Sequence, residues 1–110
     1  MSHSLAIKYV DNEVSIDICY GEVKLGKFIA DFSIISADNV KSFIFDIDER
    51  KNSSLEFNNT NGHCSIQFYE GSLRFNVCDS GNVFCSLNFQ IPYNETMGIE
   101  FRRLVEMMEN

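Results

Sequence analysis

The sequence predicts a mainly β fold of the α+β class. We expect an antiparallel sheet of about eight strands, curved or in two layers, with one C-terminal amphipathic helix packed on it. Through most of the chain hydrophobic residues alternate with polar ones, which is the period of strands with one buried face. Short turn signals separate these runs, whereas parallel strands would need helical crossovers between them. After Pro92 the apolar spacing changes to that of a helix.

Three strands are expected in the first third of the chain. Leu5–Val10 alternates and ends at an Asp-Asn turn pair, and Glu13–Tyr20 alternates more regularly. A longer strand, Val23–Ser36, should follow. Gly26 is its predicted bulge or bend, because glycine has no side chain to pack there. The residues of this strand expected to face the core are Phe28, Ala30, Phe32 and Ile34.

The middle of the chain is predicted to supply two more strands, Lys41–Asp48 and Leu55–Phe57, on either side of a polar, exposed loop. In the first of them Phe43, Phe45 and Ile47 alternate with mostly polar residues. This period of two predicts a strand.

The C-terminal half combines three strands with the helix. The strands are expected around Ile66, over Leu73–Val77 and over Val83–Ile91, and glycine-containing turns join them. Pro92 ends the last strand, and Asn94 is the predicted N-cap of the helix. The apolar stripe of the helix, expected to cover the strands that precede it, is Met97, Phe101, Leu104, Val105 and Met108.

The composition predicts one domain, residues 1–110, with enough apolar residues for a single core. The chain has no apolar run of membrane-spanning length and no signal-peptide pattern at its start, so we expect a cytoplasmic protein. Nine Lys and Arg against sixteen Asp and Glu give a formal net charge of −7. Such a charge attracts basic partners and repels phosphate backbones.

The reactive residues form no complete catalytic or metal-binding set. The four cysteines lack the C-x2-C spacing of zinc ligands, and we expect them as thiols. His63 and Cys64 are neighbours in an expected strand, so their side chains should point to opposite faces, with the cysteine in the core. Carboxylates that could serve a glycosidase or a hard metal ion lack aromatic platforms around them. The sequence therefore predicts no enzyme activity, no metal and no cofactor.

A nucleic-acid-binding sheet is one alternative. The order of four strands and a helix from Leu55 to Met108 resembles single-strand-binding transcription coactivators, which use a basic sheet with exposed aromatic residues. Here the outward positions carry one arginine and one aromatic residue, so little on this face could neutralise phosphate. These outward positions are Ser65, Gln67, Tyr69, Arg74, Asn76, Ser86, Asn88 and Gln90.

A protein-binding face is the preferred interpretation. If Glu13–Tyr20, Phe28–Ile35 and Ser42–Asp48 pair in one sheet, their outer side presents carboxylates around isoleucines, which would steer and then dock a basic partner. Alternatively, another layer of the fold covers the isoleucines, including Ile35. The predicted partner-binding residues are Asp17, Asp31, Asp46, Asp48, Glu49, Ile29 and Ile44.

A small acidic domain with carboxylates on its strands and loop, among them Asp46, Asp48 and Glu49, resembles bacterial immunity proteins as a class. The resemblance implies a non-catalytic protein that covers the basic active site of a cognate toxin, commonly a nuclease. Its carboxylates would occupy the positions of substrate phosphates. A further alternative is a structural module that forms a homodimer through the edge of Leu5–Val10 or through the isoleucines.

Overall fold

The computed structural model describes residues 2–59, 62–79 and 86–110, and these form seven strands and two helices. The predicted turns at 60–61 and 80–85, together with Cys85, lie outside the described residues. In chain order the elements are β1 (His3–Val10), β2 (Glu13–Tyr20), β3 (Val23–Asp31), α1 (Ala37–Asp48), β4 (Ser53–Asn59), β5 (Gly62–Tyr69), β6 (Ser72–Asp79), β7 (Ser86–Pro92) and α2 (Glu95–Glu109).

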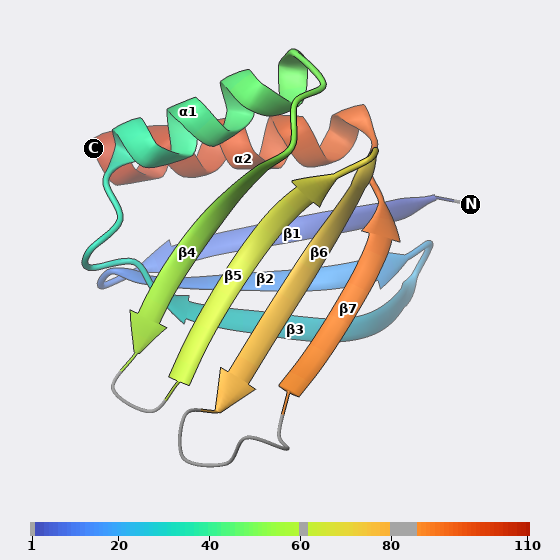
Figure 1. Cartoon of the computed structure of the whole chain (residues 1–110), viewed down its shortest axis with the longest axis horizontal. Helices are drawn as coiled ribbons and strands as arrows, with labels where there is room; N and C mark the ends of the chain where they lie inside the picture. Colours follow the sequence, from blue (N-terminus) through green and yellow to red (C-terminus); the bar gives the residue numbers. More distant parts are fainter. Residues whose placement is uncertain (1, 60–61, 80–85) are drawn as a thin grey trace.

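Two antiparallel sheets form the two layers of the fold. One has the strand order β1-β2-β3 and the other the order β4-β5-β6-β7, so each sheet is a simple meander. Figure 1 shows the second sheet lying across the first with its strands at a steep angle, and both helices together beyond β1. The prediction of a mainly β, antiparallel fold with a C-terminal helix is confirmed.

The strand predicted over Lys41–Asp48 is wrong, because this segment belongs to α1. Its buried residues Val40, Phe43 and Ile47 recur at the spacing of a helical face. Phe45, which created the apparent alternation, is 60% exposed on the opposite side. The described part of the chain therefore has one strand fewer than expected and a second helix that the period of two concealed.

β3 stops at Asp31, well before its predicted end. The Phe32 N–H donates to the Asn12 carbonyl (2.7 Å), and the Asp31 carboxylate accepts the Ser33 N–H (2.8 Å). The second bond forms a local turn in which the side chain replaces a backbone acceptor. The chain therefore leaves the sheet here, and Ile34, expected in the core, is 65% exposed.

Aromatic packing joins the two sheets. Phe32 stacks on Phe57 of β4 with ring centroids 4.7 Å apart, and Phe28 lies 5.4 Å from Phe75 of β6. All four side chains are buried. Burial of rings this large supplies much of the hydrophobic stabilisation of a small domain. The predicted inward positions Phe28, Ala30 and Phe32 are thus confirmed.

The predicted irregularity at Gly26 is also confirmed. Ile18 pairs with Gly26 whereas the next residue, Cys19, pairs with Lys24, so Leu25 is an extra residue on β3. A bulge of this kind bends an edge strand and disrupts its ladder.

α2 covers the outer edge of β1. This position differs from the one expected for the helix, over the strands that precede it in the chain. Asn94 accepts the Thr96 N–H as the N-cap and donates its own amide to the His3 carbonyl (2.7 Å). Further along the helix Arg103 donates to the Ile7 carbonyl (2.6 Å). An edge strand has unpaired carbonyls on its open side, and α2 satisfies two of them.

The predicted apolar stripe of α2 faces the interior. Phe101 meets Phe43 of α1 edge to face, with centroids 5.5 Å apart, so the helices share one contact surface. Among the described residues no helix is both long and apolar enough to cross a bilayer. Of the stripe, Met97, Phe101, Leu104 and Val105 are buried and Met108 is partly buried.

The two roles of Asn94 can be separated by mutation. Asn94→Ala removes both the cap and the bond to His3 and should lower the free energy of unfolding by about 1–2 kcal/mol. Asn94→Ser keeps an uncharged side-chain oxygen that can cap the helix and lacks the amide donor, so its loss should be smaller. Urea unfolding measures both. Stability of Asn94→Ser equal to that of the wild type would show that the bond to His3 contributes nothing.

Candidate functional site

Three of the predicted partner-binding residues share the outer face of the three-stranded sheet: Asp17, Ile29 and Asp31. The Asp17 carboxylate lies 3.2 Å from the Lys24 amine and 3.9 Å from that of Lys27, so two cations offset its charge. Ile29 is 51% exposed. This face therefore combines an exposed apolar side chain with charges of both signs.

Asp46 and Ile44 lie on α1, away from that sheet face. Asp46 accepts a hydrogen bond from the Ser53 hydroxyl of β4 (2.8 Å), and Ile44 is partly buried against the core. The expected acidic face built by one sheet is therefore wrong, because α1 replaces its third strand. The alternative of covered isoleucines holds for Ile44 and Ile35, which are partly buried against the core, and fails for the exposed Ile29.

Asp48 and Glu49 lie at the C-terminal end of α1. Asp48 pairs with Arg102 of α2 (2.7 Å), and Glu49 is the exposed C-cap. Beside this pair is a hollow of about 360 Å³ that is also lined by Tyr93. Burial, and then the Asp48 charge, raise the pKa of Tyr93. The hollow carries both charge signs, so it has no clear preference for a basic partner.

One of the predicted acidic residues, Asp46, faces a cleft of about 440 Å³ between α1 and β4. We call it the α1–β4 cleft. Its apolar lining comes from both elements and from the loop before α1, and its two carboxylates are Asp46 and Glu56. Its described lining includes no lysine or arginine. The lining residues are Ile34, Ile35, Asn39, Ser42, Phe43, Asp46, Ser53, Ser54, Leu55 and Glu56.

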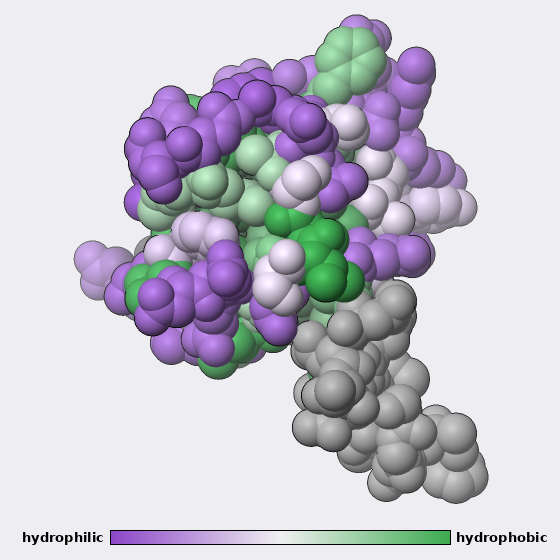
Figure 2. All heavy atoms as spheres, turned by 90° about the vertical axis from the view of Figure 1, so that its left-hand side faces the viewer, coloured by the Kyte–Doolittle hydropathy of each residue, from purple (hydrophilic) through white to green (hydrophobic). Residues whose placement is uncertain are grey.

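The loop before α1, which lines the cleft with Ile34 and Ile35, lies at the same end of the molecule as the β1–β2 turn and the end of α2 (Figure 1). Figure 2 shows hydrophobic residues gathered in the middle of this end, with hydrophilic residues around them. Val10 and Ile34 belong to these segments and are exposed by 66% and 65%. The carboxylates of the same segments are Asp11, Glu13, Asp31, Asp38 and Glu109.

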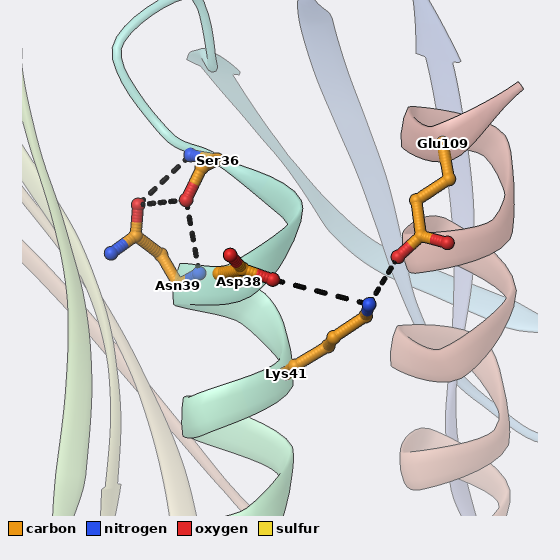
Figure 3. Close-up of polar contacts among 5 residues, drawn as sticks. All are labelled: Ser36, Asp38, Asn39, Lys41 and Glu109. Atoms are coloured by element: carbon orange, nitrogen blue, oxygen red, sulfur yellow. Dashed lines mark hydrogen bonds and ion pairs between the residues drawn. The ribbon is translucent and has the colours of Figure 1, made fainter.

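A reciprocal cap fixes the start of α1 (Figure 3). The Ser36 hydroxyl accepts the Asn39 N–H (3.2 Å), and the Asn39 side-chain oxygen accepts the Ser36 N–H (2.9 Å). Such a capping box satisfies two donors that a helix end would leave unpaired. It also holds Asn39 at the wall of the cleft.

Lys41 forms ion pairs with residues that do not line the cleft. Its amine lies between Glu109 of α2 and Asp38 of α1, as Figure 3 shows. The hydrogen bond and charge of Glu109, with a smaller effect of Asp38, raise the pKa of Lys41. The lysine of α1 is thus paired with carboxylates outside the cleft. It does not offset the negative charges of Asp46 and Glu56 in the cleft.

On the outer face of the four-stranded sheet, where a nucleic acid would bind, several polar side chains contact one another. The Asn76 amide donates to the Ser65 hydroxyl (3.1 Å) and the Gln67 oxygen (3.2 Å). Arg74 lies over the Tyr69 ring, 4.4 Å from its centroid. The arginine and the aromatic ring of this face are therefore committed to each other, which disfavours stacking of a base.

Comparison with protein-family models, curated proteins and solved structures finds no match. We therefore infer the function from the geometry of this chain. Within the described residues no group of three or more His, Cys, Asp or Glu could hold a metal ion. Cys64 is buried, as predicted, and burial raises the pKa of its thiol. The side chain of His63 lies outside the described part.

Sequence reasoning missed Glu56 and Ile34 as parts of one site. The cleft exists only because α1 is a helix. Two signals in the sequence could have revealed this helix. Ser36 and Asn39 have the spacing of a capping box, and Val40 with Phe43 and Ile47 follows the helical period.

We expect the cap at Ser36 to stabilise both the protein and the wall of the cleft. Ser36→Ala removes the acceptor for the Asn39 N–H and should cost about 1 kcal/mol of unfolding free energy. Ser36→Thr keeps a hydroxyl at the N-cap and is the matched control, expected to remain near wild type. Urea unfolding followed by circular dichroism measures both variants. Equal losses in the two would mean that the hydroxyl is not the stabilising group.

Proposed function

We propose that this protein is a non-catalytic binding protein of the immunity type, which neutralises a basic, nuclease-type toxin by covering its active site. The observation that carries the proposal is the α1–β4 cleft, whose described lining combines apolar side chains with Asp46 and Glu56 and includes no basic residue. This cleft belongs to a chain of formal net charge −7. The protein is thus still interpreted as a binder of a basic partner. The centre of the proposed binding surface is now the cleft, in place of the outer face of the three-stranded sheet.

Electrostatics and apolar contact have separate roles in this proposal. The net charge accelerates the approach of a basic partner, because complementary fields raise the rate of association. The carboxylates of Asp46 and Glu56 then take the places of substrate phosphates. Ile34, with its exposed side chain, supplies apolar area that is lost to water on docking.

The cleft alone is too small for a stable protein interface, which covers about 800 Å² on each partner. The adjoining end shown in Figure 2 extends it with exposed apolar residues inside a hydrophilic surround. Together they have the anatomy of an interface, with an apolar centre and a polar rim. Asp31, one of the predicted residues, is exposed at the end of β3, just before the loop that lines the cleft with Ile34 and Ile35. Asp17 is balanced by Lys24 and Lys27.

A capture-and-neutralisation experiment tests the proposal. The N-terminally tagged chain is cross-linked in its native cells, and each captured protein is then purified and assayed alone. We expect a basic protein that arrests growth or cleaves nucleic acid, and whose activity is lost when an equimolar amount of this chain is added. Captured proteins whose activity the chain leaves unchanged would contradict the proposal.

The carboxylates of the cleft should govern how fast that partner associates. The double variant Asp46→Asn/Glu56→Gln should slow association by about three- to tenfold at low salt, and the difference should shrink as salt screens the charges. Stopped-flow fluorescence measures the rates.

The matched control Glu22→Gln/Glu95→Gln removes the same charge from the β2–β3 turn and from the start of α2, at two exposed residues that do not line the cleft. It should slow association much less. Equal effects of the two double variants would show that net charge acts without a defined site.

A further inference from the structure

The four sheet edges differ in how they are closed. α2 satisfies carbonyls of β1, as described above, and β3 carries a bulge at Leu25 with Lys24 and Lys27 on either side of it. At β7 the hollow lined by Asn88 and Phe89 also includes Lys27. A basic segment would be repelled at these last two edges. β4 is the edge that borders the acidic α1–β4 cleft.

The direction of the free backbone groups on β4 follows from the next hairpin. Glu70 and Gly71 have φ angles of 49° and 81°, the signature of a two-residue type I′ turn. Such a turn is closed by a hydrogen-bonded pair, which here is Tyr69 with Ser72. Hydrogen-bonded residues alternate along an antiparallel strand. Every second residue of β5 counted back from Tyr69 therefore bonds to β6, and the residues between them bond to β4.

Ile66 is one of the β5 residues that bond to β4, and its partner is Leu55. Leu55 therefore uses its N–H and carbonyl on β5. The residues beside it, Ser54 and Glu56, direct theirs away from the sheet, and both residues are exposed. An added strand would find these groups along the wall of the cleft, since Ser54, Leu55 and Glu56 all line it.

The cleft also specifies the side chains of an added strand. Residues alongside Leu55 would face the interior side, where Ile34 and Phe43 line the cleft. Residues alongside Ser54 and Glu56 would share the outer side with the Glu56 carboxylate. Because strand side chains alternate between faces, the complementary sequence alternates apolar and basic residues.

We infer that the partner docks by adding an extended segment of alternating apolar and basic residues to the free edge of β4. This inference rests on the proposed function and specifies how the same site recognises its partner. Main-chain hydrogen bonds supply affinity in this mode, and alternate side chains supply specificity. A second copy of the chain is a poorer occupant, because its own β4 would bring another Glu56 to a cleft that is already acidic.

The probe for this inference is a short acetylated peptide of alternating lysine and valine, added to the ¹⁵N-labelled protein. We expect the amide protons of Ser54 and Glu56 to shift and to exchange more slowly with solvent. Unchanged exchange at these two amides would overturn the inference.

Two N-methylated versions of the peptide separate strand pairing from charge attraction. In antiparallel pairing the lysine N–H groups bond to β4, and in parallel pairing the valine N–H groups do so. Methylation of the bonding set should weaken binding by about tenfold or more, while methylation of the other set should have little effect. Equal affinity of the two methylated peptides would contradict strand addition.

A variant of the protein tests the same edge from the other side. Ser54→Pro removes an outward N–H, which an edge strand tolerates, and Ser54→Ala keeps it. We expect the proline variant to bind the lysine–valine peptide about tenfold more weakly and the alanine variant to bind as the wild type does. If the proline variant does not fold, the two methylated peptides decide the question on the wild type.

The outcomes separate this inference from the proposed function. A neutralised toxin that binds Ser54→Pro as tightly as the wild type would overturn strand addition and leave the proposed function standing. Protection of the Ser54 and Glu56 amides by a second copy, without peptide, would overturn the commitment to a basic partner.

Discussion

The contact between Phe32 and Phe57 is the interaction on which the rest of the structure depends. Phe32 is the first residue after β3, its N–H is bonded to the β1–β2 turn, and its ring stacks on β4 of the other sheet. The contact therefore joins the layers at the point where the chain leaves the first sheet. It also determines where the following loop runs, and with it the place of Ile34 at the mouth of the cleft.

The two helices cover the neighbouring sheet edges to different extents. α2 lies along β1 and donates hydrogen bonds to its carbonyls, so that edge is closed to further strands. α1 packs on α2 and meets β4 through the bond between Asp46 and Ser53. The remainder of that wall is open as the α1–β4 cleft. Two carbonyls of the β1 edge are thus satisfied by side chains, whereas the β4 edge borders an open cleft.

The hydrophobic periodicity of the sequence correctly predicted elements that have one buried face and one exposed face. β2 has one buried face, the bulge at Gly26 follows from a residue without a side chain, and α2 has a cap and an apolar stripe. α1 was missed because Phe45 is apolar and exposed, which turned a helical face into an apparent alternation. The cleft could not be predicted even from correct elements, because Ile34, Asp46 and Glu56 meet only through the packing of three segments.

The ion pair between Lys41 and Glu109 joins the last turn of α2 to the N-terminal half of α1. Figure 1 places Asn110 at the end of the molecule that carries the loop before α1, and the N-terminus at the opposite end. A reporter or affinity handle fused after Asn110 would therefore crowd the proposed docking surface and disturb this ion pair. The same handle fused before Ser2 would leave both untouched, so the position of a fusion decides whether binding is measured or masked.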